Sequence, residues 1–364
     1  MAKNNTSRIV RYILNSGGAS KAQIASDLNL SMPTVLAGLK GLMDEEIIIE
    51  DGSYESTGGR KAKNNIVNPN LRYSVGVDIT GSHIGLVIID MTGQLVSNKR
   101  IRMKFEPTIA YCQEWAKMLN GFIDDSAIDK SKILGVGVAI AGIVDNSSRM
   151  LLRSHALNVT NLSLKNLENS ISLPIYFEND ANAALMAEST SDTENLMYIS
   201  LSNTVGGSIY LNGKIYRGMG QKAGEFGHMI LHPGGRKCYC GKIGCSDAYL
   251  SALNLRLNDE MTLEEFMELL KNGDKDCEKV WDEYLDDLAL LITNLRASFD
   301  SEIIIGGYVG YYIEDYLMEL SKKIIAYSTF DLDAGFLRPS IKKREASASG
   351  AAGYFINEYI DNIS

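Results

Sequence analysis

Apolar side chains recur at helical spacing in three short runs within the first 45 residues. The first run spans 6–16 and stops at Gly17-Gly18. The second spans 20–28 and the third begins at Ser31, with Ser20 and Ser31 placed to act as N-caps. The third helix is expected to bury Val35, Leu36, Leu39 and Leu42. A β-type run at 47–49 and a turn signal at 51–52 follow, so residues 1–67 are predicted to form a winged helix-turn-helix.

After Asn68-Pro69-Asn70 the pattern changes to longer apolar runs, typical of buried strands, that alternate with helical patterns. The predicted strands are 73–78, 83–90, 133–140, 174–177, 196–201, 207–211 and 303–305. The predicted helices are 109–124, 181–188, 262–272, 277–298, 312–327 and 346–360. This alternation predicts α/β sheets, with functional side chains where the strands end.

Composition indicates the cellular compartment in which the chain is expected to function. No apolar run reaches the ~18 residues of a membrane-spanning helix, and the first residues lack the continuous apolar core of an export signal. We therefore expect a cytoplasmic chain without a membrane partner. Three of the five cysteines lie within eight residues, which in a reducing compartment indicates a metal site rather than disulfides.

Charge is unevenly distributed along the chain. Residues 1–63 hold eight Lys/Arg against seven Asp/Glu, whereas the remainder holds 28 against 38, within a net charge of −9. An acidic body is a poor general nucleic-acid binder. The N-terminal segment is thus the only part whose charge permits contact with DNA phosphates.

The cysteine cluster has the donor set of a zinc site. His228 with Cys238, Cys240 and Cys245 makes a Cys3His set suited to tetrahedral Zn²⁺, and Gly241 and Gly244 let the loop fold around the ion. Four protein ligands would leave no open position, so the metal is expected to be structural. His232 is a competing fourth ligand, and three buried thiols without metal are the remaining alternative.

A set of motifs, taken in order, closely resembles the repressors of the ROK family (repressors, uncharacterised reading frames and sugar kinases), of the xylose-repressor-like type. The motifs are S-x-P-T-V at 31–35, S-T-G-G-R-K at 56–61, V-G-V-D-I at 75–79, G-V-G-V-A-I-A-G-I-V-D at 135–145, E-N-D-A-N-A-A at 178–184, G-E-F-G-H at 224–228, C-x-C-G-x-x-G-C at 238–245 and I-G-G at 305–307. The resemblance spans nearly the whole chain.

The resemblance implies an α/β, actin-like sugar-kinase (ribonuclease H-like) fold of two lobes behind the winged helix. The expected domains are residues 1–67 for DNA binding, 71–185 with 346–364 for the first lobe, and 186–345 for the second lobe with its zinc loop. A sugar or a sugar derivative such as a sugar phosphate is then expected to bind between the lobes as the effector.

The resemblance also assigns a sugar site. Asp180 matches the catalytic base of the kinases and, without ATP, would hold a sugar hydroxyl; Asn179 beside it offers a donor and an acceptor. Glu225 is expected to bind hydroxyls, and His228 to ligate zinc while it faces the sugar. Asp247 stands where the family usually has Glu, so its sugar contact is expected with a side chain one methylene shorter.

Two departures bear on catalysis. The first phosphate loop of the kinases, D-x-G-G-T, is here Asp-Ile-Thr-Gly-Ser at 78–82, and the second, G-T-G-I-G-A-G, is Ser-Asn-Thr-Val-Gly-Gly-Ser at 202–208. Glycines in such loops let backbone N–H groups approach phosphate oxygens. Their replacement predicts poor ATP binding beside an intact sugar half, and hence a regulator that is not an enzyme.

DNA contacts are expected from the third helix and from the wing. The candidates to face bases are Ser31, Met32, Thr34 and Val35, with Lys40 and Arg11 reaching phosphates. In the wing, Arg60 and Lys61 follow two glycines, and Arg60 is expected to enter a narrow A·T-rich minor groove.

Together these features predict a sugar-responsive repressor of carbohydrate-utilisation genes. It would bind a palindromic operator in double-stranded DNA as a homodimer or homotetramer, because one short helix reads few base pairs. The alternative is an ATP-dependent, glucokinase-like sugar kinase with an accessory DNA-binding domain, supported by Asp180. A weaker third hypothesis is a zinc-regulated sensor.

Overall fold

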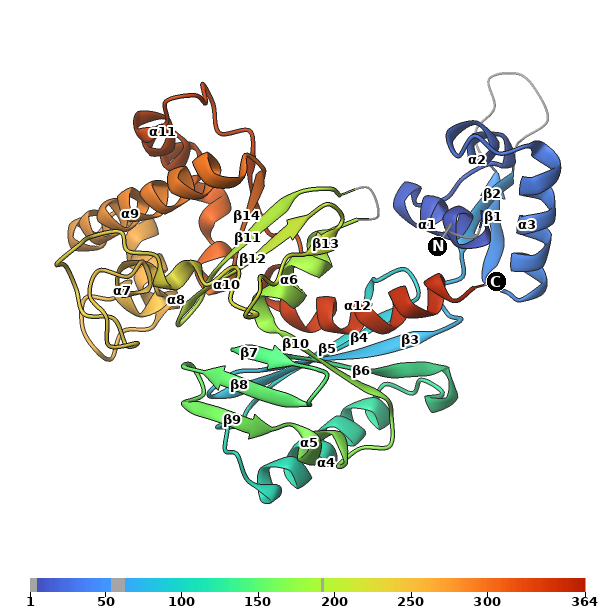
Figure 1. The fold of residues 1–364 in the computed structure, drawn as a ribbon, viewed down its shortest axis with the longest axis horizontal. Coiled ribbons are helices and arrows are strands. Elements are labelled where there is room, and N and C mark those ends of the chain that lie inside the picture. Colours follow the sequence, from blue (N-terminus) through green and yellow to red (C-terminus); the bar gives the residue numbers. More distant parts are fainter. Residues whose placement is uncertain (1–4, 54–62, 191–192, 364) are drawn as a thin grey trace. The chain divides into compact units, whose positions relative to one another are not determined.

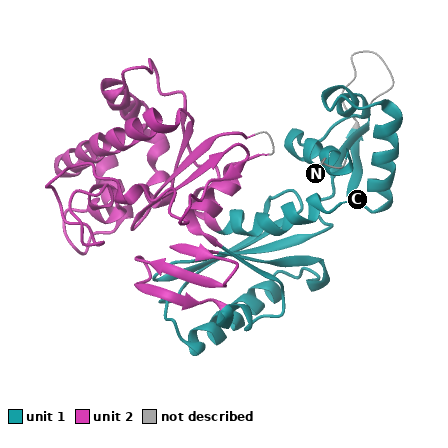
Figure 2. Cartoon of the chain, viewed as in Figure 1, with its two compact units in different colours: residues 1–138, 165–177, 348–364 teal, residues 139–164, 178–347 magenta. Residues whose placement is uncertain are grey.

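The computed structural model describes residues 5–53, 63–190 and 193–363 (Figure 1). They form two compact units (Figure 2): residues 1–138, 165–177 and 348–364, and residues 139–164 and 178–347. The predicted winged helix and most of the predicted first lobe share unit 1, while 139–164 and 178–185 group with unit 2. The three-domain boundaries drawn from the sequence stay a prediction.

The N-terminal segment forms the three helices and the hairpin that its pattern predicts. Helices α1 (Asn5–Ser16), α2 (Lys21–Asp27) and α3 (Met32–Asp44) precede the antiparallel strands β1 (Ile48–Ser53) and β2 (Lys63–Val67). Ser20 forms a capping box with Gln23, and the Ser31 hydroxyl accepts the Thr34 N–H, so both predicted caps start their helices. The shared core contains Ile9, Ile13, Ile24, Val35, Leu39 and Leu42.

Unit 1 also contains a five-stranded sheet of order β10-β6-β3-β4-β5. Its strands are β3 (Tyr73–Ile79), β4 (His83–Asp90), β5 (Leu95–Arg102), β6 (Ile133–Ile140) and β10 (Ile175–Asn179), of which β3, β4 and β5 pair antiparallel. The ends of β6 and β10 belong to unit 2. Helix α12 (Ala346–Asp361) covers one face, and α4 (Ile109–Asp125) and α5 (Lys165–Glu168) lie on the other (Figure 1).

Glycines in the sheet let α12 approach the strands very closely. A Cβ at Gly76 would lie 2.0 Å from the Ala348 carbonyl oxygen, and one at Gly137 would lie 1.9 Å from that of Ala351. Such distances leave no room for any side chain at these positions. Beyond the sheet, α12 joins the core of the winged helix through Ile356.

A polar contact reinforces this junction. The Arg11 guanidinium of α1 donates to the Asp361 carboxylate at 2.6 Å and to the Asn357 side-chain oxygen at 3.0 Å. These bonds hold the Arg11 side chain against α12, and its expected phosphate contact stays a prediction.

Unit 2 is built on a second five-stranded sheet, of order β13-β12-β11-β14-β15. Its strands are β11 (Leu196–Leu201), β12 (Val205–Leu211), β13 (Lys214–Ile215), β14 (Glu302–Gly306) and β15 (Leu337–Pro339). The α-helices are α6 (Asp180–Glu188), α7 (Asp247–Leu250), α8 (Leu263–Lys271), α9 (Lys275–Phe299), α10 (Gly307–Gly310) and α11 (Leu317–Tyr327). Its core includes Phe266, Trp281, Leu288 and Ile305.

Most predicted strands and helices recur within a few residues, and the α/β class is confirmed. The pattern missed the exposed edge strand β5 and a small antiparallel sheet of β7 (Ile143–Asp145), β8 (Met150–Ser154) and β9 (Val159–Ser163). These short strands have few buried positions, so no clear alternation marks them. None of the helices described is long and apolar enough to cross a membrane.

The close packing of α12 is testable by adding one methyl group. Gly137→Ala should lower the stability by about 1–3 kcal/mol, because the new Cβ collides with backbone that cannot move independently of α12. Gly121→Ala, on α4 with nothing near its Cβ position, should be neutral or stabilising. Thermal melts of the two variants check this, and equal melting temperatures would contradict the packing described.

Candidate functional site

A cavity of about 330 Å³ lies in unit 2. Its lining comes from residues 141–144, 153–156, 179–182, 204–207, 217, 221–225, 228 and 239. The first two stretches belong to the β7–β9 region, and the third contains the start of α6. Residues 204–207 lie at the start of β12, and the remaining lining residues follow β13. The volume is that of a small-ligand site.

The β10–α6 junction brings two predicted sugar-site residues to the cavity. Asn179 is the N-cap of α6: its side-chain oxygen accepts the Asn182 N–H, and its amide donates to the Gly142 carbonyl, both at 3.0 Å. Asp180 is the first residue of the helix, and burial raises the pKa of its carboxyl to about 6 although backbone N–H groups oppose the shift. A carboxylate so placed can accept a hydroxyl proton.

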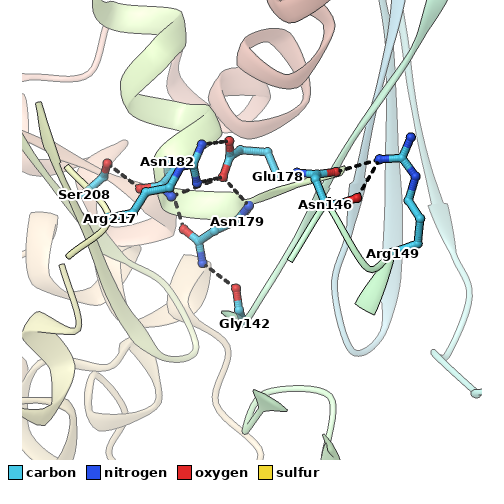
Figure 3. Close-up of polar contacts among 8 residues, drawn as sticks. All are labelled: Gly142, Asn146, Arg149, Glu178, Asn179, Asn182, Ser208 and Arg217. Carbon is cyan, nitrogen blue, oxygen red and sulfur yellow. Dashed lines mark hydrogen bonds and ion pairs between the residues drawn. The ribbon is translucent and has the colours of Figure 1, made fainter. Parts of the chain in front are cut away.

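A buried ion pair supports this junction (Figure 3). The Arg217 guanidinium donates to both oxygens of Glu178, at 2.8 and 2.6 Å, and Glu178 is only 1% exposed. Glu178 also accepts the Asn179 N–H at 2.9 Å and the Asn182 amide at 3.2 Å. Asn182 in turn accepts the Ser208 hydroxyl at 2.7 Å. These contacts tie α6 to β12 and fix the start of the helix beside the cavity.

The G-E-F-G-H motif at 224–228 places two further polar side chains, Glu225 and His228, at the cavity. Glu225 precedes a 3-10 turn, Phe226–His228, which places its carboxylate 3.9 Å from the His228 Nε2. A Cβ at Gly227 would lie 2.2 Å from the Val205 carbonyl oxygen, so this glycine lets the turn pack on β12. Both Glu225 and His228 line the cavity, as expected from the sequence.

The four predicted metal ligands lie together. The ligand atoms of His228, Cys238, Cys240 and Cys245 all lie within 4.8 Å of one another. The His228 Nδ1 is buried without a hydrogen-bond partner, which suits a metal ligand. The soft thiolate and imidazole donors fit a tetrahedral ion with no open position.

His232, the competing ligand, is excluded from this cluster. Its Nε2 pairs with the Asp287 carboxylate of α9. The loop reaches its conformation through Gly244, which has a φ of +84° and whose Cβ would lie 2.1 Å from the His232 carbonyl oxygen.

Sequence reasoning missed several residues that line the cavity: Arg153, His155, Arg217, Lys222 and Tyr239. The rings of His155, His228 and Tyr239 meet edge to face, with centroids 5.5–5.7 Å apart. Tyr239 stands between Cys238 and Cys240, so its position could have been inferred from the ligand spacing. His155 lies just after β8, where no pattern marked a strand.

The predicted sugar contact of Asp247 is not supported. Its side chain is buried, it is absent from the cavity lining, and its carboxylate accepts the Val205 N–H at 2.6 Å. Burial raises the pKa of this carboxyl to about 6. The Asp247 carboxylate thus binds the backbone of the 202–205 turn and stabilises that turn.

In each of the two loops that correspond to phosphate loops, some backbone N–H groups already bind acceptors within the protein. The Thr80 N–H and hydroxyl both donate to the His83 carbonyl, at 3.0 and 2.9 Å, and the hydroxyl accepts the His83 N–H. In the second loop Ser202 donates to the Thr204 carbonyl, and Val205 donates to Asp247. Thr80 thus closes a hairpin at the position where a glycine would expose its backbone.

The exposed face of α3 differs from the face predicted to contact DNA. Val35 is fully buried in the core of the winged helix, so its expected base contact is wrong. Leu36, expected to be buried, is 45% exposed, and Met32 is 41% exposed. Ser31 and Thr34 are joined by the cap, with their hydroxyls 2.7 Å apart. Lys40 is exposed, whereas Arg60 and Lys61 lie outside the described residues.

The chain is similar in sequence to proteins of a known family. The model of the ROK family matches residues 74–358. The chain belongs to the ROK family. Over 379 aligned residues it is 24% identical to the xylose repressor of Bacillus subtilis, with 100% of this chain and 97% of that protein covered.

Two solved structures show the same ROK fold. A ROK family transcriptional regulator, described as a homologue of the E. coli MLC protein, superposes with a TM-score of 0.76 at 20% identity, covering 98% of this chain and 96% of that one. A ROK family glucokinase from Streptomyces griseus, in complex with glucose and AMPPNP, superposes with a TM-score of 0.67 at 24% identity. The match covers 78% of this chain and 98% of the glucokinase chain. The first match includes the winged helix, and the second covers a smaller share of this ROK chain.

The raised pKa of Asp180 has a measurable consequence. A folded-state pKa near 6 lies above the ordinary 3.8, so this group lowers the stability as the pH rises through that interval. Asp180→Asn should therefore raise the stability at pH 7.5 by about 1–3 kcal/mol, with little gain at pH 4. Melting curves at both pH values test this, and Asp129→Asn, at an exposed carboxyl whose pKa is lowered, should give no gain at pH 7.5.

Proposed function

We propose that this ROK protein is a sugar-responsive, DNA-binding transcriptional repressor of carbohydrate-utilisation genes. The observation that carries the proposal is that one chain contains both a winged helix and a cavity lined by Asn179 and Asp180. The full-length similarity to a xylose repressor supports it.

In this proposal the cavity binds sugar hydroxyls. The Asp180 and Glu225 carboxylates accept hydroxyl protons, the Asn179 side chain remains locked by its cap bonds, and the His228 Nε2 edge completes the pocket. Asp247 acts indirectly, through the Val205 N–H. Arg217 holds Glu178 beneath Asn179 and thereby keeps Asp180 in place.

The metal site is proposed to hold a structural Zn²⁺ bound by His228, Cys238, Cys240 and Cys245. Zinc would supply no reactive water, because all four positions are taken by protein. Its role is to fix the His228 ring and the Tyr239 side chain at the cavity wall. That role disfavours a zinc-regulated sensor, because a closed site stays filled at physiological zinc.

The DNA-binding face is proposed to be the exposed side of α3. Met32, Leu36 and Lys40 stand four residues apart and are exposed, so they share one face of the helix. Ser31 and Thr34 stand at its N-terminus, where a recognition helix meets base edges. Arg60 is proposed to enter the minor groove, and Lys61 to contact the DNA beside it. A short reading helix implies a palindromic, A/T-rich operator and a homodimer or homotetramer in the cytoplasm.

The second candidate function is an ATP-dependent sugar kinase. It is favoured by Asp180, whose raised pKa suits a general base, and by the similar fold of a glucokinase crystallised with glucose and AMPPNP. We propose the non-catalytic regulator instead, because Thr80 and Val205 have their N–H groups engaged where phosphate oxygens would need them.

A gel-shift assay tests the repressor. The full chain should bind DNA upstream of its own operon, and one member of a sugar panel should change that affinity at least tenfold. Lys40→Gln should weaken binding about uniformly across sequences, whereas Lys322→Gln, on α11 in unit 2, should not. A coupled assay showing several ADP released per second, abolished by Asp180→Asn, would instead establish the kinase.

Metal content tests the zinc proposal. The purified chain should contain about one zinc per molecule by elemental analysis, and Cys240→Ser should lose most of it together with several degrees of melting temperature. Cys112→Ser, at a thiol of α4 outside the cluster, should keep its zinc. Equal zinc content in the two variants would refute the assignment.

A further inference from the structure

Helix α6 is fixed at both ends by a buried carboxylate that is paired with an arginine. At its start, Glu178 binds the Arg217 guanidinium of the cavity wall. At its end, the Glu188 side chain is completely buried and accepts a hydrogen bond from the Arg338 guanidinium of β15 at 2.9 Å. Arg338 also donates to Glu302 of β14, at 2.5 Å. The two ends of one helix are therefore attached to different parts of unit 2.

Glu188 also binds the segment of chain that leads into α12. Its second oxygen accepts the Ser340 hydroxyl at 2.7 Å and the Lys342 N–H at 2.9 Å. These two bonds and the bond from Arg338 all come from residues 338–342, and α12 follows that segment. One side chain at the end of α6 thus holds the segment that precedes α12.

Apolar packing joins the same two helices. Ala346, the first residue of α12, is 3% exposed and belongs to one buried cluster with Ala184 and Leu185 of α6. The first two residues of α12 belong to unit 2 and the remainder to unit 1, where Ile356 joins the core of the winged helix. With 16 residues, α12 is about 24 Å long. Because its backbone is hydrogen-bonded throughout, a displacement of its first turn is carried along the helix.

Stability alone does not account for a carboxylate at the end of α6. A negative charge at the C-terminal end of a helix opposes the helix dipole, and a buried ion pair is often no more stabilising than an apolar pair of similar size. The buried face of α6 includes Ala181, Ala183 and Ala184, whose small side chains interlock little with the neighbouring sheet. The polar contacts at the two ends therefore determine where α6 lies along its axis.

We propose that Glu188 is a positioning residue that couples the cavity to operator binding. A sugar hydroxyl bound by Asp180, the first residue of α6, shifts the helix along its axis, and the bonds of Glu188 carry that shift to residues 338–342 and to α12. The helix then has two positions, and the sugar acts on DNA binding only as far as it favours one of them. This inference rests on the proposed function and names the contact that links its two sites.

Paired titrations of the full chain test the inference. Gel shifts on the DNA upstream of its own operon give the operator dissociation constant with and without each member of a panel of pentoses, hexoses, N-acetylhexosamines and their phosphate esters. The member with the largest effect on the parent chain is the probe for the variants, and calorimetry gives its own dissociation constant. The ratio of the two operator constants is the coupling factor, which should be at least about tenfold in the parent chain.

Glu188→Gln should reduce the coupling factor to about twofold or less, because the amide nitrogen cannot accept the bond from Arg338. The sugar constant and the sugar-free operator constant should each stay within about threefold of the parent values. The double variant Glu188→Leu with Arg338→Met replaces the pair by apolar side chains, which often preserves or raises stability. It should fold and lose the coupling factor in the same way.

Asp331→Asn is the matched control. Asp331 is a partly buried carboxylate of unit 2 that binds Arg296 and the Ser328 hydroxyl, so its loss should lower the melting temperature and leave the coupling factor unchanged. A Glu188→Gln chain that keeps the parent's coupling factor would overturn this inference and leave the repressor standing. Loss of both affinities with an unchanged ratio would reduce Glu188 to a structural role and overturn it too. If no panel member changes the operator affinity of the parent chain, the proposed function itself fails.

Discussion

The buried pair between Glu178 and Arg217 is the interaction on which the site depends. Glu178 is almost fully buried and accepts hydrogen bonds from Arg217, from the Asn179 N–H and from the Asn182 amide. A buried charge that loses its partner costs about 3–5 kcal/mol, and less here because a third of the Arg217 side chain is exposed. The pair therefore contributes less to net stability than to position: it fixes where α6 begins.

The position of that helix start determines what the cavity can do. Asp180 meets the cavity at the first turn of α6, and Asn179 is locked to Gly142. In the loops that correspond to phosphate loops, the Thr80 N–H binds the His83 carbonyl and the Val205 N–H binds the Asp247 carboxylate. These two bonds support the proposal that the cavity senses a ligand rather than serving a kinase reaction.

The local features of this structure could be read from the sequence. The four residues of the candidate metal cluster follow from their spacing in the sequence, and the Asn179-Asp180 corner follows from a strand that ends in polar residues. Features that depend on tertiary packing could not be predicted from the pattern alone. The pattern predicts that both Val35 and Leu36 are buried, but Leu36 lies about 100° further round α3 than Val35 and is exposed. Asp247 lies 42 residues from the Val205 N–H that it binds. Arg153 and His155 belong to a short sheet whose burial has no regular period.

The central claim is that sugar binding and operator binding are linked through one chain. Linkage is reciprocal, so the factor by which a sugar changes operator affinity must equal the factor by which operator DNA changes sugar affinity. The most direct measurement is the sugar dissociation constant of the full chain with and without saturating operator duplex. The account predicts values that differ at least fivefold, and the same factor in the converse titration. Equal sugar affinities in the presence and absence of operator would contradict it.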